Sequence, residues 1–207
     1  MKSGDKIAVD ADTGVIVRAE FTRGSKPHRD GDLPAIIKRH PLTLIIFSEI
    51  YLRDGKTHRD GDKPAVIMRD PMTGNELQLG YFRDGKQHRD GDKPAYIEKD
   101  AATGRVIYEV YAKDGNNHRD GGKPAIRKID ATTGVVVYEA YLVAGAWHRA
   151  GKKPAIIRRD AATGAVIYEG YFINGEEVGK DVRPKRPKPP SRPRLLLVKN
   201  PLDTKPA

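Results

Sequence analysis

The dipeptide His-Arg recurs along the chain at every thirtieth position, at 28–29, 58–59, 88–89, 118–119 and 148–149. An aromatic residue keeps the same interval at 21, 51, 81, 111, 141 and 171, and Pro-Ala keeps it at 34–35, 64–65, 94–95, 124–125 and 154–155. A fixed period of this length is the signature of a repeat architecture, in which each unit packs mainly against its neighbours. The period therefore restricts the chain to an array of similar units.

Within one copy, residues 58–60 match the His-Arg-Asp tripeptide of a kinase catalytic loop, and residues 60–62 resemble the start of a calcium loop. A kinase also needs a Gly-rich loop and Asp-Phe-Gly, which the chain lacks. A calcium loop closes on a Glu about twelve positions in, whereas Pro64 and apolar residues follow here. The histidines, spaced by two strands or ~9–10 Å, are too far apart to share an ion. We expect a protein that is not an enzyme and has no cofactor or metal site, with acids that cap turns.

Each repeat has the composition of β structure. Residues 104–115, GRVIYEVYAKDG, are rich in β-branched and aromatic residues and end at Asp-Gly, a strong hairpin signal. The segment DAATG at 100–104 suits a type I turn closed by a Gly in the left-handed region. Two long strands per repeat, joined by alternating tight turns, predict an all-β fold: an elongated antiparallel meander of about twelve strands in a single twisted sheet.

The two-residue turn also predicts a register. With Asp54-Gly55 at the tip, Tyr51 lies opposite His58, and the same pairing recurs in the five repeats that contain the His. We therefore expect each recurrent His to pack beside the recurrent aromatic as a cross-strand pair. Strand alternation then directs Arg59 to the other face.

The segments YLRDGKTHRDGDKPA and YFRDGKQHRDGDKPA, which begin at Tyr51 and Tyr81, resemble the MORN-type repeat in its bacterial and viral variant. The resemblance covers about residues 10–177 and departs where Asp62-Lys63 or its equivalent stands between Gly and Pro. It implies a twisted, single-layer antiparallel sheet used as a binding surface. Some bacterial members of that variant are labelled antitoxins.

The positive charge is concentrated near the C-terminus. Of the net charge of +10, residues 180–207 carry +7, from nine Lys or Arg and two Asp, so only +3 falls on the rest of the chain. The chain has no Cys, no apolar run of the ~18 residues that span a membrane, and no signal-peptide segment. We expect a cytoplasmic protein with a β-repeat domain at 1–177 and a basic, Pro-rich tail at 178–207.

The tail combines prolines, basic residues and a short apolar segment at 195–198, so it is a candidate partner-binding element. It could act as an arm for nucleic acid or acidic surfaces, as a PxxP ligand, or as a strand that adds to a sheet edge. Its candidate binding residues are Arg183, Lys185, Arg186, Lys188, Arg192, Arg194, Leu195, Leu196 and Leu197.

Two copies depart from the repeat pattern. In VAGAWHRAGKKPA at 143–155, three acids are lost and Trp147, the only tryptophan, appears. Trp147, Arg149, Lys152 and Lys153 are therefore candidate partner-binding residues, with a cap or a seat for the tail as the alternative. We expect Trp147 to be covered by a partner, a second copy or residues 195–198. The second departure, HPLTLIIFSEIY at 40–51, suggests local repacking or a docking patch.

These features predict a non-catalytic macromolecular binding module, most simply a protein-binding inhibitor or antitoxin-like neutraliser. The alternative is a structural or assembly subunit of a virion or large complex, anchored through its basic tail to neighbours or nucleic acid. The expected partner is another protein; nucleic acid through the tail and self-association are the alternatives, and no membrane partner is expected.

Overall fold

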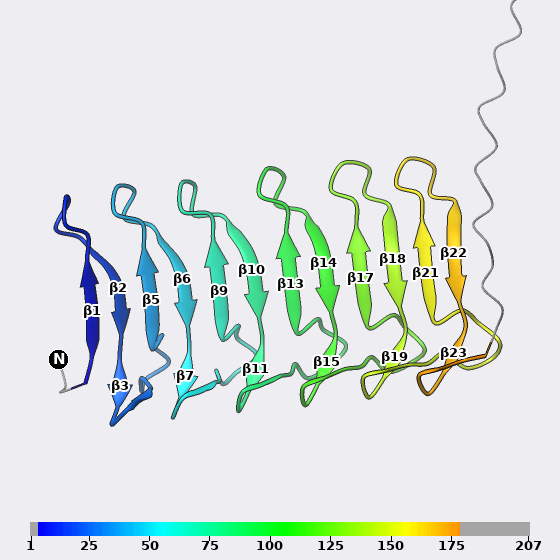
Figure 1. Ribbon diagram of the computed structural model, residues 1–207, viewed down its shortest axis with the longest axis horizontal. Coiled ribbons are helices and arrows are strands. Elements are labelled where there is room, and N and C mark those ends of the chain that lie inside the picture. Colours follow the sequence, from blue (N-terminus) through cyan, green and yellow to red (C-terminus); the bar gives the residue numbers. More distant parts are fainter. Residues whose placement is uncertain (1–3, 179–207) are drawn as a thin grey trace, which may run out of the picture.

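A computed structural model describes residues 4–178, and this part of the chain is built from β-strands. Twelve strands form one antiparallel sheet (Figure 1). They are β1 Lys6–Val9, β2 Ile16–Glu20, β5 Ile36–Arg39, β6 Ile46–Ile50, β9 Val66–Arg69, β10 Glu76–Gly80, β13 Tyr96–Lys99, β14 Val106–Val110, β17 Ile126–Ile129, β18 Val136–Ala140, β21 Ile156–Arg159 and β22 Val166–Gly170.

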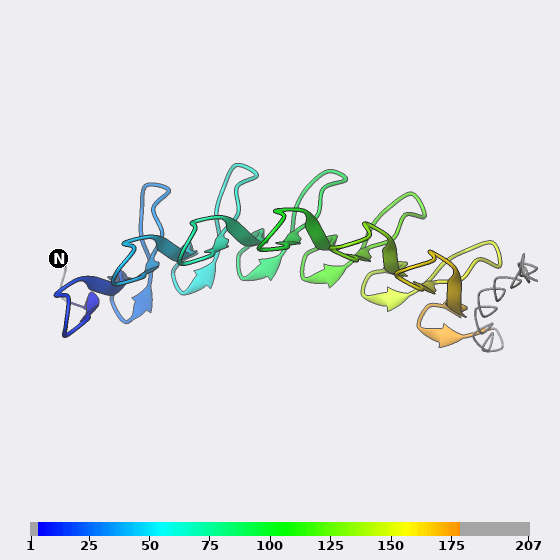
Figure 2. The ribbon, with the colours of Figure 1, turned by 90° about the horizontal axis from the view of Figure 1, so that it is seen from above.

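The order of strands in the sheet follows their order in the chain, with no crossover. The sheet stays open, so β1 and β22 form its two edges. The predicted all-β, elongated antiparallel meander is therefore confirmed. Seen from above, the repeats follow one another in a single, gently curved row (Figure 2). Nothing in residues 4–178 has the length and apolar character of a helix that crosses a bilayer.

The repeat unit begins at the residue that caps the tight turn between two long strands. Repeats 1 to 5 span 10–39, 40–69, 70–99, 100–129 and 130–159, and repeat 6 is described from 160 to 178. In repeat 4, one Asp100 oxygen accepts hydrogen bonds from the Thr103 N–H at 2.8 Å and the Thr103 hydroxyl at 2.7 Å. Gly104 closes the turn with φ of 69°. The predicted Asp-capped turn is confirmed.

Repeat 2 keeps this turn although its sequence departs from the pattern. His40 takes the place of the Asp, and its Nδ1 accepts a hydrogen bond from the Thr43 N–H at 3.2 Å. Leu44 occupies the glycine position with φ of 60°, and its N–H donates to the His40 carbonyl at 3.0 Å. The departure at 40–51 is thus accommodated locally in the backbone, while Leu42 and Leu44 have exposed side chains.

The second connection of each repeat is longer than predicted. In repeat 2 the chain leaves β6 and forms a separate small hairpin, β7 Leu52–Arg53 and β8 Lys56–Thr57. Asp54 and Gly55, both with positive φ, make the turn that the twist of a hairpin favours. A loop from 58 to 65 then returns to the sheet at β9. The expectation of two tight turns per repeat was therefore wrong for this connection.

Six such hairpins lie in a row at the ends of the strands, along one long side of the large sheet (Figure 1). Besides β7 and β8 they are formed by β3 Thr22–Arg23 with β4 Lys26–Pro27, β11 Phe82–Arg83 with β12 Lys86–Gln87, β15 Ala112–Lys113 with β16 Asn116–Asn117, β19 Leu142–Val143 with β20 Ala146–Trp147, and β23 Phe172–Ile173 with β24 Glu176–Glu177.

The core is thin and is repeated from unit to unit. At the point where each loop rejoins the sheet, the alanine of Pro-Ala is fully buried at Ala35, Ala65, Ala95, Ala125 and Ala155. The Ala65 N–H donates to the Gly80 carbonyl, and the Ala65 carbonyl accepts from the Tyr51 N–H, each at 2.8 Å. A larger side chain there would overpack the junction between hairpin and sheet. This explains why the position is alanine in five repeats.

Candidate functional site

The recurrent arginine of each repeat stacks on the recurrent aromatic of the same repeat. In repeat 2 the Arg59 guanidinium lies 3.7 Å from the centroid of the Tyr51 ring, and one of its N–H groups donates to the Pro64 carbonyl at 3.1 Å. The same stacking occurs in five repeats, at 3.5–3.7 Å. Such pairs stabilise a fold by ~0.5–2 kcal/mol. The recurrent Arg therefore has a structural role.

This placement corrects one expectation. The backbone register was predicted correctly, because the His58 N–H donates to the Tyr51 carbonyl at 3.0 Å. The arginine, however, does not point to the other face, and it is the arginine that stacks on the aromatic ring. The physical reason is that β8 ends at Thr57, so strand alternation no longer governs Arg59.

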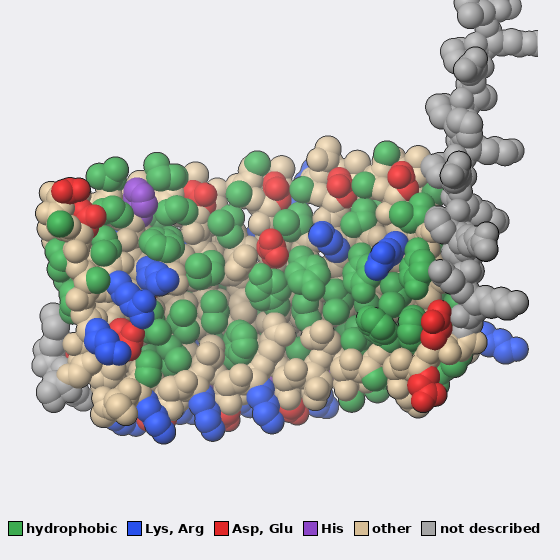
Figure 3. Space-filling model, viewed as in Figure 1, with side chains coloured by type: hydrophobic (Ala, Val, Ile, Leu, Met, Phe, Trp, Pro, Cys, Tyr) green, Lys and Arg blue, Asp and Glu red, His purple; other side chains and the backbone are tan. Residues whose placement is uncertain are grey.

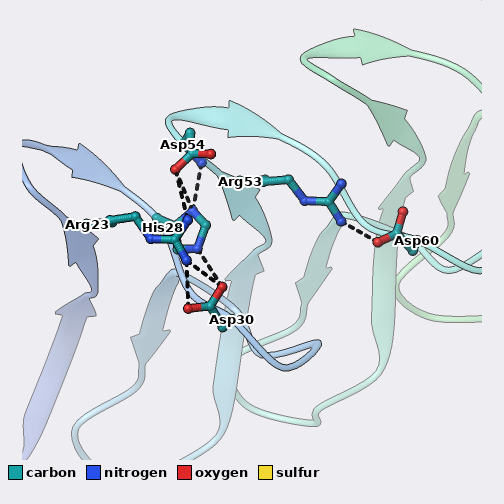
Figure 4. A network of polar contacts seen from close by, with 6 residues as sticks. All are labelled: Arg23, His28, Asp30, Arg53, Asp54 and Asp60. Carbon is teal, nitrogen blue, oxygen red and sulfur yellow. Dashed lines mark hydrogen bonds and ion pairs between the residues drawn. The ribbon is translucent and has the colours of Figure 1, made fainter.

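The recurrent histidine joins each repeat to the next hairpin, as Figure 4 shows for His28. Its Nδ1 accepts a hydrogen bond from the Asp54 N–H at 2.9 Å, and Nε2 lies 2.9 Å from Asp30. Nδ1 also lies 3.0 Å from a carboxylate oxygen of Asp54, so both ring nitrogens have polar partners. His28, His58 and His88 are buried and bonded at both ring nitrogens.

A second set of polar contacts crosses the boundaries of repeats 1 to 4. Asp62 of repeat 2 accepts a hydrogen bond from Arg89 Nε at 2.6 Å and another from Lys93 Nζ at 2.7 Å, both in repeat 3. We call this arrangement the Asp-Arg-Lys triad. It recurs as Asp32 with Arg59 and Lys63, and as Asp92 with Arg119 and Lys123.

The two cations of each triad favour the ionised form of its carboxylate. The hydrogen bond from Arg89, followed by that from Lys93, lowers the pKa of Asp62 to about 2. Arg59 and Lys63 lower the pKa of Asp32 to about 2 in the same way. Each triad thus holds a carboxylate anion between an Arg and a Lys of the following repeat.

The two acids of the Asp-Gly-Asp segment have separate partners. Asp60 contacts His58 Nε2 at 2.9 Å and forms an ion pair with Arg53, whereas Asp62 pairs with the next repeat. Within residues 4–178, no group of three or more His, Cys, Asp or Glu residues is placed to hold a metal ion. The expectation that these two acids cap turns was therefore wrong, because their carboxylates pair with His, Arg and Lys side chains of neighbouring segments.

The structure places Trp147 on the short hairpin strand β20, beside the hairpin of repeat 6. The centroid of its ring lies 5.0 Å from that of Phe172, with 57° between the two planes. The residue remains 41% exposed. The hairpin of repeat 6 therefore covers part of the Trp147 ring. The sequence had suggested a partner, a second copy or residues 195–198 as the cover, and not a neighbouring repeat.

Arg149 retains the anchors of the other arginines but has lost its carboxylate. It stacks on Tyr141 at 3.5 Å and donates to the Pro154 carbonyl at 3.1 Å. Gly122 stands where the triads have Asp, so no carboxylate among residues 4–178 pairs with Arg149. Lys153 stands at the triad Lys position and is exposed, as is Lys152.

Trp147, Arg149, Lys152 and Lys153 thus lie on one hairpin and loop of repeat 5, as their sequence positions implied. The remaining predicted binding residues lie outside the described residues: Arg183, Lys185, Arg186, Lys188, Arg192, Arg194, Leu195, Leu196 and Leu197.

Three tyrosines not singled out from the sequence lie at equivalent positions of successive repeats. Tyr108, Tyr138 and Tyr168, here called the tyrosine row, occupy the same position in β14, β18 and β22. Lys128 lies between the first two and Arg158 between the last two, by direct strand pairing. The Arg158 guanidinium is 5.9 Å from the Tyr138 ring centroid and 5.2 Å from that of Tyr168.

The tyrosine row belongs to the C-terminal half of the sheet. Tyr96 on β13 extends it, with its ring centroid 6.0 Å from that of Tyr108 in an edge-to-face arrangement. A hollow of about 620 Å³ is lined in part by Tyr108, Lys128 and Tyr138. Figure 3 shows hydrophobic side chains gathered over β13–β22 on the visible face. In repeats 1 to 3, the tyrosine position is held by Arg18, Ser48 and Gln78.

Burial raises the pKa of Tyr108 and of Tyr138, although both side chains remain partly exposed. The row therefore presents three amphipathic rings, with one cation between each neighbouring pair of rings. The signal that could have found it is the recurrence of tyrosine at 108, 138 and 168, which follows the period of the array but begins only in repeat 4.

Comparison of the chain with models of protein families, with curated proteins and with solved structures gives no match.

Proposed function

We propose that the chain is a non-catalytic protein-binding module whose principal contact surface is the tyrosine row. The observation that carries the proposal is the row itself: Tyr108, Tyr138 and Tyr168 lie partly exposed on an open sheet, beside Lys128 and Arg158. Tyrosine and arginine are enriched at the centres of protein interfaces, because they combine a large apolar area with polar groups. An antiparallel sheet that is open on this face presents them on a rigid support.

The recurrent polar residues support a binding role rather than catalysis. The histidines of repeats 1 to 3 use both ring nitrogens to hold the array, so neither nitrogen is free to act as a general base. The recurrent arginines stack on aromatic rings and bind carbonyl oxygens. Because the recurrent His and Arg side chains make contacts within the array, we expect a partner to bind residues that differ from one repeat to another.

Affinity capture with the full-length chain tests the proposal. We expect the wild type to capture one protein at fixed stoichiometry and to re-form that complex from purified components. The triple variant Tyr108→Gln, Tyr138→Gln and Tyr168→Gln introduces the residue found at position 78 and should lose the partner. The matched control Met72→Gln changes an exposed apolar side chain in a tight turn of repeat 3 and should keep it.

Retention of the partner by the triple variant, with its melting temperature unchanged, would place the contact surface elsewhere. The narrower role of inhibitor or antitoxin-like neutraliser requires that the purified chain also reduce the activity of the captured protein. Self-assembly of the purified chain, without any second component, would instead favour the structural or assembly subunit.

A further inference from the structure

The boundary between repeats 4 and 5 retains the two cations of the triad without the acid. The three complete triads serve as internal references for what such an Arg and Lys pair binds. In them the Arg Nε lies 2.5–2.6 Å from one carboxylate oxygen, and the Lys Nζ lies 2.5–2.7 Å from the other. Arg149 and Lys153 are the corresponding residues at this boundary.

Arg149 is held in the same way as the arginines of the complete triads. Its ring contact of 3.5 Å and its carbonyl contact of 3.1 Å match those of Arg89, at 3.6 Å and 3.1 Å. Its backbone N–H also donates to the next hairpin, at Phe172, as that of Arg89 does at Ala112. The guanidinium is therefore preorganised, and its Nε has no carboxylate partner among residues 4–178.

The space for an acidic side chain is open at this boundary. Gly122 has φ of 64°, close to the 54° of Asp32 and of Asp62, so the backbone here has the left-handed conformation found in two of the three complete triads. A Cβ built on Gly122 would meet no heavy atom within 4 Å. The surrounding repeat 5 segment 143–153 contains no Asp or Glu, and Lys152 adds a further positive charge.

We infer that Arg149 and Lys153 bind a carboxylate side chain, Asp or Glu, supplied by a protein partner. The partner's carboxylate would then take the place that Asp32, Asp62 and Asp92 occupy in the three complete triads. A carboxylate is favoured because the three complete triads bind one with both of its oxygens, and charge-assisted hydrogen bonds of this kind are strong and directional. Trp147 lies partly exposed in the preceding hairpin strand and adds an apolar contact for the same partner.

This inference deepens the proposed function and rests on it, but it can be tested without the partner. The probe is a capped Gly-Glu-Gly peptide titrated into the full-length chain at fixed ionic strength, with Gly-Gln-Gly as its neutral counterpart. The readout is the arginine Nε–H resonance in a nitrogen–proton correlation spectrum, assigned by Arg→Lys variants. We expect the glutamate peptide to shift the signal of Arg149 and to leave Arg59, Arg89 and Arg119 unchanged.

The variant Gly122→Asp supplies the missing carboxylate within the chain. It should move the Arg149 signal toward those of the three complete triads and weaken the response to the peptide about tenfold. Gly134→Asp is the matched control: it adds the same charge at a glycine of positive φ with an equally open Cβ position, but in a tight turn. This control should respond as the wild type does.

Three results would overturn the inference. The first is an unmoved Arg149 signal in the wild-type titration, which does not depend on any variant folding. The second is an equal shift of all four arginines, which indicates unspecific charge attraction. The third is a shift caused by a single-stranded oligonucleotide and not by the peptide, which assigns the pair to phosphate. Because no partner is used, each result is distinct from the outcome of the tyrosine-row capture.

Discussion

The backbone N–H of Asp84 donates a hydrogen bond to Nδ1 of His58, 3.0 Å away and 26 residues earlier in the chain. Each recurrent histidine thus fixes the turn of the next hairpin, while Asp62 fastens the next Arg and Lys. A single loop therefore has two independent connections to the following repeat. Stability in such an array depends on these boundaries as much as on the units.

Loss of the recurrent His-Arg pair should destabilise the array. Replacing both His88 and Arg89 by Ala removes two ring-nitrogen contacts, the contact with Asp62 and the stacking on Tyr81. We expect the free energy of unfolding in urea to fall by at least about 2 kcal/mol. The exposed Arg105→Ala serves as control and should change it little. An unchanged melting temperature with loss of binding would instead make the pair functional.

The turn of repeat 2 should be improved by glycine. Leu44 has φ of 60°, whereas the other five repeats have Gly at this position, with φ of 69–79°. Leu44→Gly relieves the left-handed strain, partly offset by the entropy of glycine in the unfolded chain, so we expect a gain of about 0.5–1 kcal/mol. The reciprocal variant Gly104→Leu should lose a similar amount. A destabilised Leu44→Gly protein in urea unfolding would refute this account.

Acidification should weaken the repeat boundaries. The folded pKa values of Asp32 and Asp62 are about 2, below the ordinary value of 3.8, so ionisation of these groups favours the folded state. Their contribution to the free energy of unfolding is present above about pH 4 and is lost as the pH falls through about 2. Urea midpoints should therefore decline across this range.

The variant Asp62→Asn isolates this effect. It should be less stable than the wild type near neutral pH, and the difference should shrink toward pH 2, where the wild-type carboxyl also becomes neutral. A difference in unfolding free energy that stays constant over the whole range would show that the charge of Asp62 contributes nothing.

The fluorescence of Trp147 should report its contact with Phe172. Since Trp147 is the only tryptophan and is 41% exposed, its emission should lie between those of buried and fully hydrated indole. Phe172→Ala should shift the emission to the red. Phe82→Ala, at the equivalent position of repeat 3, is the control and should leave it unchanged. A further blue shift on adding the partner is expected if Trp147 enters the interface.

The strand pattern could be predicted because each determinant lies within one repeat. Asp100, Thr103 and Gly104 define a turn through local hydrogen bonds and backbone preference, and Asp54-Gly55 defines a hairpin. The placement of Arg59 could not be predicted in this way, since it depends on where strand β8 ends and on the path of the following loop.

The candidate site was predicted in part. Trp147, Arg149, Lys152 and Lys153 stand out in the sequence because repeat 5 loses its acids there. The importance of Gly122 could not be inferred, because the partnership of Asp92 with Arg119 and Lys123 spans 27 and 31 residues and becomes visible only in three dimensions. The recurrence of tyrosine at 108, 138 and 168 is visible in the sequence, but the placement of Lys128 and Arg158 between these rings depends on the strand pairing.

The uninterrupted strand order has a consequence for how the chain can change in length. Each repeat adds two strands, so one unit lengthens the sheet by about 9.6 Å at ~4.8 Å per strand. Duplication or deletion of one whole repeat would alter this length in equal steps and leave the other boundaries as they are. The number of repeats on each side of Gly122 therefore sets the distance from the boundary between repeats 4 and 5 to each end of the array.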